Sequence, residues 1–343
     1  MTTDSQPRIR SQSSDSTYTL TSTQKAHFLE HGYIRIPGCF TAEKAASWTH
    51  DLWIRLGYSA SDKTTWDAER INMPHHRQEA VSTFAPKAWS AICELCGGEE
   101  RISDDTEFRS WRDSFIVNLG KDEWEGDDRQ GQLDPRQLDN WHVDGDFFWH
   151  FLDSPEQALL VIPLFSDIKP SGGGTIICPE AIGLMARYLY EHPEGVSPHM
   201  VSRPQAQNPE SDPGLTFYKS LVQNCTDFRE MTGEIGDVIL LHPLMLHSAS
   251  RNSLRIPRII TNPPVALKEP FNLNREDPSQ YSLIERKTLL ALGKDRLRGW
   301  KITTGRERIV PARMKKFYEM KVAEEERLRE AGRRIASGSE VGV

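Results

Sequence analysis

Short apolar runs dominate the middle of the chain, and glycine or proline separates most of them. They cover residues 115–119, 158–165, 175–178, the stretch after Gly236-Asp237, and 259–261. Runs of this length between turn residues are typical of buried strands. Ser171-Gly172-Gly173-Gly174 reads as a tight turn into the third run. The pattern therefore predicts a mainly β fold, a double-stranded β-helix (jelly roll, cupin-like) with helices packed outside it.

Helical patterns lie mainly at the two ends of this β region. Residues 21–30, 41–56 (with Thr41 as cap) and 84–96 are expected to be helices, and 34–36 a short strand. Beyond Pro270 the composition becomes charged, and residues 315–334 are strongly helix-forming. We expect a jelly-roll domain with N-terminal helices over 18–270. A charged helical extension over 271–343 would cover the domain or form a homodimer.

Two polar stretches are expected to lack regular structure. Residues 1–17 are rich in serine and threonine and almost without apolar side chains, which predicts a disordered tail. The charged, glycine-containing segment 120–139 is expected to be an exposed loop that leads into the next motif.

The composition narrows the partners and the compartment. A formal charge of −7 and a pI near 5.9 argue against a nucleic-acid ligand and against an anionic membrane surface. No apolar run approaches the length of a membrane span, and five cysteines, an odd number, suit a reducing compartment. We therefore expect a soluble cytoplasmic protein that acts on a small molecule.

Three residues have the composition of an open metal site. His142 and Asp144 are separated by one residue, so on an extended segment both side chains point to one face. His247 ends the apolar run that follows Gly236. Two imidazoles and one carboxylate, with other positions open, mark non-haem Fe(II) oxygenases. His242 is the competing histidine, and Pro243 after it prevents a choice between the two by strand alternation alone.

At these residues the chain resembles a known family. His142-x-Asp144, followed by His247, Asn252 and Arg258, is similar to the phytanoyl-CoA dioxygenase-like group of Fe(II)/2-oxoglutarate oxygenases. The segment 20–38 is similar to that group's entry helix and first strand, and the resemblance covers roughly residues 18–265. It implies that His142, Asp144 and His247 bind Fe(II), that 2-oxoglutarate and O2 are co-substrates, and that Arg258 holds the far carboxylate of 2-oxoglutarate.

The chemistry of arginine agrees with that last role. A dicarboxylate needs a permanently charged, planar group at the bottom of its pocket, and arginine supplies two parallel hydrogen bonds. Arg251 and Arg255 are the neighbouring alternatives, but Arg255 lies an odd number of residues away and would face the other side of a strand. By the same resemblance, Thr175 is expected to contact the co-substrate, and Asn118, on the strand before the metal motif, is a candidate contact for the co-substrate or the substrate.

The residues around the metal pair are candidates for the substrate pocket. Trp141, Asp146 and Phe148 flank the motif, and Phe148 lies in the aromatic run 147–151. This run is either core packing or an aromatic wall of the substrate chamber. The remaining histidines, which lack a ligand partner at suitable spacing, are expected to be surface or capping residues: His27, His31, His50, His75, His76, His150, His192 and His199.

The sequence supports oxidation of a small molecule, by hydroxylation, desaturation or ring formation, and the family analogy favours a specialised metabolite as substrate. Because the carboxylate Asp144 is present, halogenation is disfavoured. A Zn-dependent hydrolase or lyase could use the same ligand set, since zinc also keeps an open position for water. A non-catalytic jelly-roll binding protein is the third alternative.

Overall fold

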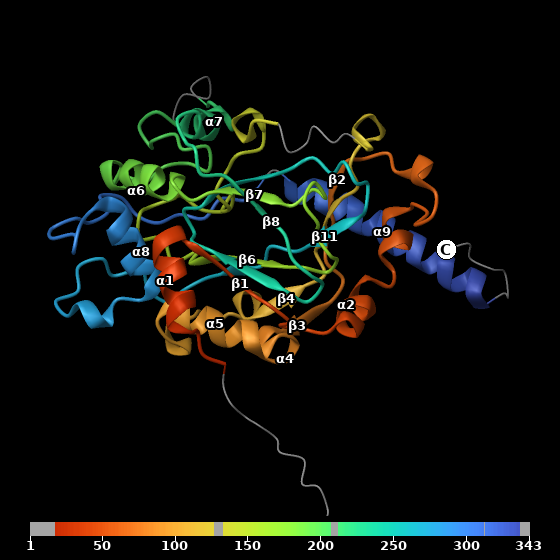
Figure 1. Ribbon diagram of the computed structural model, residues 1–343, viewed down its shortest axis with the longest axis horizontal. Helices are drawn as coiled ribbons and strands as arrows, with labels where there is room; N and C mark the ends of the chain where they lie inside the picture. Colours follow the sequence, from red (N-terminus) through yellow and green to blue (C-terminus); the bar gives the residue numbers. More distant parts are fainter. Residues whose placement is uncertain (1–17, 127–132, 207–211, 312, 337–343) are drawn as a thin grey trace, which may run out of the picture.

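The computed structural model of the chain describes residues 18–126, 133–206, 212–311 and 313–336 (Figure 1). The tail 1–17, which was expected to be disordered, lies outside the described residues. So does the middle of the expected loop 120–139, at 127–132.

Twelve described strands pair in four sheets, and every pairing is antiparallel. One sheet has the order β1-β9-β6-β12, and the others are β10-β7-β8, β11-β5-β2 and β3-β4. The strands are β1 (Tyr33–Ile36), β2 (Arg70–Asn72), β3 (Gln78–Ala80), β4 (Ser110–Arg112), β5 (Ile116–Asn118), β6 (Leu159–Pro163), β7 (Thr175–Cys178), β8 (Arg229–Met231), β9 (Val238–Leu241), β10 (Leu246–Ala249), β11 (Arg258–Ile260) and β12 (Pro264–Val265). The predicted antiparallel β fold with flanking helices is confirmed at this level.

The strands predicted from apolar runs form the centre of the molecule. Every residue of β6 and β9 is buried, so both faces of this sheet are covered. In Figure 1 the sheet that contains β7 lies above the one that contains β1 and β6, with α5 below them. Near-continuous apolar strands fit this position, because neither face meets water.

Two helices differ from the prediction for identifiable reasons. The expected helix 41–56 is split into α2 (Ala42–Thr49), which Thr41 caps, and α3 (Leu52–Leu56). Asp51 between them has non-helical backbone angles, and its carboxylate pairs with Arg77. The helix expected over 84–96 begins at Pro86, because the residue before a proline is driven to extended geometry, and Ala85 has φ −143°.

The other helices lie around the strands. They are α1 (Ser22–His31), α4 (Val81–Phe84), α5 (Pro86–Cys96), α6 (Ala181–Glu191), α7 (Thr216–Val222), α8 (Leu283–Leu292) and α9 (Arg313–Ala336). Short 3-10 turns occupy Lys63–Thr65, Glu99–Arg101, Thr106–Phe108, Asp122–Trp124, Pro135–Gln137 and Pro278–Gln280. None of the helices in the described residues is both long and apolar enough to cross a membrane.

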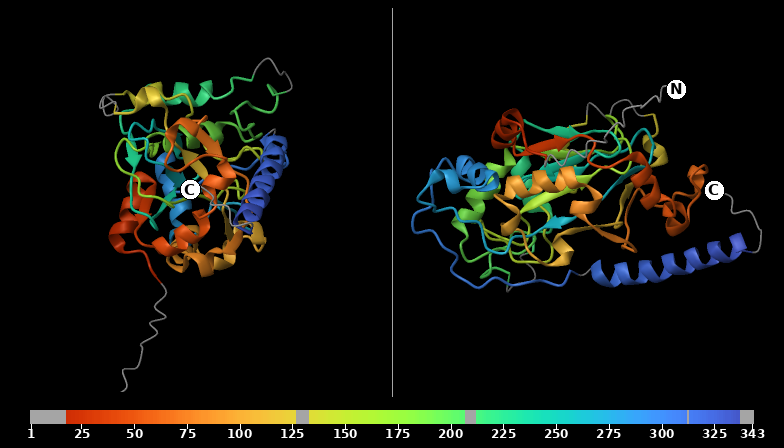
Figure 2. Two further views of the ribbon diagram at one scale, coloured as in Figure 1. Left: turned by 90° about the vertical axis from the view of Figure 1, so that its right-hand side faces the viewer. Right: turned by 90° about the horizontal axis from the view of Figure 1, so that it is seen from below.

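The C-terminal extension folds back onto the strand region. Helix α8 packs against α1 and α6, and α9 runs along the outside of the molecule and packs against α3 (Figure 2). The segment that links α8 to α9 also pairs with residues 147–149. Trp149 N–H donates to the carbonyl of Glu307, and Ile309 N–H donates to that of Phe147. The extension therefore forms backbone pairs with the aromatic run that follows the metal motif.

A buried charge cluster fixes α9 to the rest of the chain. The Arg55 guanidinium donates from Nε to Glu324 of α9 at 2.9 Å and from Nη1 to Asp113 at 2.9 Å. His76 Nε2 lies 2.8 Å from the same Glu324 oxygen. All three charged side chains, of Arg55, Asp113 and Glu324, are almost inaccessible to solvent.

Replacing Glu324 with alanine is expected to lower the free energy of unfolding by about 3 kcal/mol, the lower end of the range for breaking a buried ion pair, because Asp113 still partners Arg55. Urea unfolding at neutral pH measures this loss. Glu325, the exposed neighbour on the same helix, is the matched control. Its alanine variant should change stability by less than about 0.5 kcal/mol. Equal losses in the two variants would contradict this role of Glu324.

Candidate metal centre

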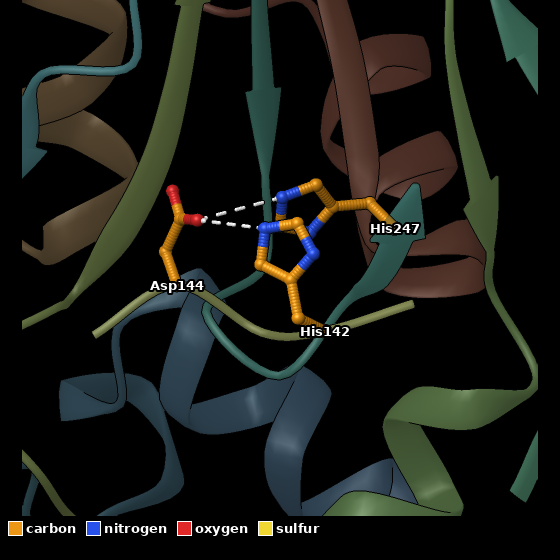
Figure 3. A group of neighbouring side chains, drawn as sticks. All are labelled: His142, Asp144 and His247. Carbon is orange, nitrogen blue, oxygen red and sulfur yellow. Dashed lines mark ion pairs between the residues drawn. The ribbon is translucent and has the colours of Figure 1, made fainter. Parts of the chain in front are cut away.

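His142, Asp144 and His247 meet at one point in the structure (Figure 3). The backbones of His142 and His247 pair with each other through N–H···O=C bonds of 3.1 and 3.0 Å. Asp144 lies in the turn that follows His142. One ligand atom from each of the three side chains lies within 4.8 Å of the other two. A single ion can therefore contact all three.

Backbone carbonyls orient both imidazoles. His142 Nδ1 lies 2.7 Å from the carbonyl oxygen of Asn140, and His247 Nδ1 lies 3.1 Å from that of Met245. A carbonyl only accepts, so Nδ1 carries the proton in each ring. Each Nε2 faces Asp144, as Figure 3 shows, and offers its lone pair to a metal only when that nitrogen carries no proton. This is the usual second-sphere arrangement of metal-binding histidines.

The two oxygens of Asp144 have different surroundings. Oδ1 lies 3.4 Å from His142 Nε2 and 3.5 Å from His247 Nε2. Oδ2 accepts a hydrogen bond of 3.1 Å from the side-chain amide of Asn262. Burial by itself would raise the pKa of Asp144, but hydrogen bonds from the two histidines outweigh it and hold that pKa well below its ordinary value. The site thus keeps a negative charge for a cation.

His242 lies in the core, away from the three candidate metal ligands and out of contact with solvent. It is fully buried, its Nδ1 accepts from Leu244 N–H at 3.2 Å, and its Nε2 donates to the Thr288 hydroxyl at 3.0 Å. Both ring nitrogens are used, so His242 is a core residue. Burial, with a smaller effect of the Lys287 charge, lowers its pKa from 6.5 to about 3.

This pKa gives a stability change with a defined sign. Between pH 6.5 and about 3 the unfolded chain binds a proton at His242 that the folded chain does not. Stability is therefore lost as the pH falls through this window, by about 2 kcal/mol at pH 5 from this residue. Urea unfolding at pH 7.5 and pH 5 should show the loss in wild type. The His242→Gln variant should lose about 2 kcal/mol less over the same interval, and an identical loss would contradict the assignment.

His150 corrects one of our predictions, because it is neither a surface nor a capping residue. It is buried, its Nε2 contacts the carbonyl oxygen of Gly145 at 2.8 Å, and its ring stacks on Phe148. Burial lowers its pKa to about 4. Gly145 has φ +120°, and a Cβ there would lie 2.4 Å from the Phe148 ring, so the turn directly after Asp144 needs glycine. The aromatic run is folded inward here, which its sequence alone left open.

Arg258 is a buried cation with an incomplete set of partners. It is 2% exposed, and its Nε donates to the carbonyl of Gly173 at 2.9 Å. Its Nη1 is buried and has no hydrogen-bond partner in the part of the chain that the structure describes. Burial, and secondarily the charge of Arg70, lowers its pKa to about 10, so it stays positive at neutral pH. A buried charge without a counter-ion is costly, which points to an absent anion.

Strand β7 connects Arg258 to the metal ligands. Ile177 is the cross-strand partner of His247, and Thr175 is the partner of Ala249, so Thr175 shares the face of His247. Gly173, which Arg258 contacts, precedes Thr175 by two residues. Gly173 has φ +79°, so the chain turns there before β7 begins at Thr175. Along the chain, Thr175 therefore lies between the residue that contacts Arg258 and the residue that pairs with His247.

Asn118 is placed next to Arg258 but uses its amide elsewhere. The two residues are cross-strand partners in β5 and β11. The Asn118 Nδ2 donates to the carbonyl of Ser250 at 3.0 Å, and its Oδ1 accepts from Gly120 N–H at 3.1 Å. These bonds hold the loop around Gly173 in place. Direct contact of Asn118 with the co-substrate stays a prediction.

The three residues expected in the substrate pocket have different positions. Phe148 lines a small pocket with Asp144, and the other lining residues are His150, Phe151, Leu152, Ser154, Gln157, Pro243, Leu244 and Phe271. Asp146 forms an ion pair with Arg313, the first residue of α9. Trp141 is fully buried, packs against Phe228 and donates to the carbonyl of Pro135. Its pocket role is untested, and its observed contacts are those of a core residue.

Two residues near the centre were not predicted. Asn262 holds Asp144, and its only sequence signal is its place after the Arg258 strand and before Pro263-Pro264. Arg313 reaches Asp146 from a segment that is distant in sequence, and no local pattern indicates this contact.

No known family profile and no curated protein matches the chain. Among solved structures it is similar to HygX from Streptomyces hygroscopicus with nickel, 2-oxoglutarate and hygromycin B bound (13% identity, 73% of this chain and 88% of that one, TM-score 0.39). It is also similar to the non-heme alpha ketoglutarate dependent epimerase SnoN from nogalamycin biosynthesis (15%, 71% and 82%, 0.35) and to EctD from S. alaskensis with 2-oxoglutarate and 5-hydroxyectoine (14%, 72% and 75%, 0.35). Likeness at this level assigns neither family nor activity.

Proposed function

We propose that this protein is an Fe(II)/2-oxoglutarate-dependent oxygenase that oxidises a small molecule. The observation that carries the proposal is the combination of two features that strand β7 links. One is an open site of two histidines and one aspartate, and the other is a buried arginine whose Nη1 has no hydrogen-bond partner among the described residues. The first suits Fe(II), and the second suits the far carboxylate of a dicarboxylate.

The residues fit these groups chemically. His142, Asp144 and His247 would hold the metal through two Nε2 atoms and Asp144 Oδ1. Arg258 Nη1 would donate to the far carboxylate, and Thr175 is placed to donate its hydroxyl to the same group. When bound, iron and 2-oxoglutarate would supply O2 activation, with 2-oxoglutarate giving up two electrons as it becomes succinate and CO2, and O2 supplying the oxidising equivalents for hydroxylation, desaturation or ring formation. The double-stranded β-helix is part of the proposal, and the antiparallel pairings are compatible with it.

The chain's own contribution is orientation and the exclusion of water. Backbone carbonyls fix both imidazole rings, and Asn262 fixes the carboxylate. Phe148, Phe151 and Phe271 line a cavity of about 20 Å³ beside Asp144, which has room for roughly one water, so they keep bulk water away from this carboxylate. A zinc hydrolase on the same ligands would have no use for a buried cation whose Nη1 lacks a partner in the described segments.

Conversion of 2-oxoglutarate to succinate tests the proposal. Fe(II)-loaded protein in air should form succinate, detected by mass spectrometry, even without its proper substrate. The same protein under argon, or loaded with Zn(II), should form none. Absence of succinate from iron-loaded protein, together with ester hydrolysis by the zinc-loaded form, would favour the hydrolase alternative. Absence of metal binding would favour the non-catalytic alternative.

A further inference from the structure

Asn262 lies where two sheets meet and next to a metal ligand. It follows β11, which carries Arg258, and precedes β12, whose Pro264 pairs with Leu160 of β6. Strands thus hold the segment 258–265 near both ends, and two prolines fix its backbone after Asn262. A side chain on such a segment has little freedom to move away from its partner.

The partner of Asn262 is one particular oxygen. Its Nδ2 donates to Asp144 Oδ2 at 3.1 Å, whereas both imidazole Nε2 atoms lie near Oδ1. An ionised carboxylate only accepts, so the amide must present its N–H to Oδ2. This bond uses one lone pair of Oδ2 and turns that oxygen toward the amide, so Oδ1 is the oxygen that faces the two imidazoles.

The distinction matters because a carboxylate can bind a metal through one oxygen or two. Three ligands on one face of an octahedral ion leave the three opposite positions open. A chelating keto acid takes two of these positions, and a diatomic gas takes the third. If both oxygens of Asp144 bound the ion, one of those positions would be lost.

We propose that Asn262 is a positioning residue that keeps Asp144 bound through Oδ1 alone, and so preserves the position that O2 needs. The inference rests on the proposed function and adds a specific role for one amide. This role differs from that of an outer-sphere partner that only orients Asp144 and raises metal affinity. Loss of an ordinary outer-sphere partner lowers metal affinity by about 10–100-fold. Loss of Asn262 should instead leave metal affinity nearly intact, because a second oxygen replaces the lost bond.

The test uses full-length protein loaded anaerobically with Fe(II) and 2-oxoglutarate, with nitric oxide as the probe of the last position. Electron paramagnetic resonance of the iron-nitrosyl signal measures its occupancy. The variants are Asn262→Ala, Asn262→Leu, which fills a similar space without a donor, and Asn262→Gln, which keeps the amide. The matched control is Asn252→Ala, because within the described ranges the Asn252 amide donates to the backbone carbonyls of Asn118 and Ile256 and to no metal ligand.

The expected result is Fe(II) affinity within about threefold of wild type in all Asn262 variants, well short of the usual outer-sphere loss. Nitric oxide binding should weaken at least about tenfold in the alanine and leucine variants and recover in glutamine. Asn252→Ala should lower stability without this change. A 10–100-fold loss of Fe(II) affinity with unchanged nitric oxide binding would overturn the inference, as would no change at all. If wild type forms no 2-oxoglutarate complex, the proposed function fails as well, which distinguishes that failure from a failure at Asn262 alone.

Discussion

Replacing Arg258 with alanine is expected to weaken 2-oxoglutarate binding to the metal-loaded protein by roughly 30-fold to several thousand-fold. This range corresponds to the loss of about 2–5 kcal/mol when one partner of a buried, hydrogen-bonded ion pair is truncated. The Arg258 guanidinium stays charged at neutral pH, and its buried Nη1 has no hydrogen-bond partner among the residues that the structure describes. We therefore expect the carboxylate of 2-oxoglutarate to be that partner. Isothermal titration calorimetry under argon measures the change.

The same substitution should lower the free energy of unfolding of the ligand-free protein by much less than it lowers the free energy of 2-oxoglutarate binding. The uncompensated cation is a cost to the folded state that alanine removes, so the two effects should separate. Arg255 is the matched control, because it is also 2% exposed but forms an ion pair with Asp122 and lies over the Trp66 ring. Arg255→Ala should keep 2-oxoglutarate affinity and lose stability. The reverse pattern would exclude Arg258 as the carboxylate site.

Replacing His247 with alanine is expected to abolish stoichiometric Fe(II) binding. It removes one of three direct ligands, so the affinity should fall by more than the 10–100-fold typical of an outer-sphere change. Equilibrium dialysis with metal analysis measures the loss. His242→Gln is the control, since this nearby histidine lies in the core and bonds to Thr288. Loss of iron in the His242 variant, with retention in the His247 variant, would reverse the assignment.

Features of the structure that depend on local spacing could be predicted from the sequence. The residues separated by one position, His142 and Asp144, converge with His247, and Arg258 lies buried on the predicted strand. The apolar runs became strands, because their side chains had to leave water on both faces. Proline at 86 and the charge pairing of Asp51 moved helix ends that periodicity alone could not place.

Contacts between distant segments could not be predicted from the sequence. Asn262 reaches Asp144 across 118 positions, and Glu324 reaches Arg55 across 269. Each contact depends on how the sheets and helices pack, and neither residue stands in a pattern that marks it. The burial of His150 could not be predicted either, because it depends on how the aromatic run 147–151 packs against the rest of the fold.

The most direct measurement is an anaerobic titration of the protein with Fe(II) and then 2-oxoglutarate, followed by visible absorption. The proposed arrangement of His142, Asp144, His247 and Arg258 predicts a metal-to-ligand charge-transfer band in wild type. In Arg258→Ala the band should require a far higher 2-oxoglutarate concentration. Bound iron without any band at saturating 2-oxoglutarate would contradict the oxygenase assignment.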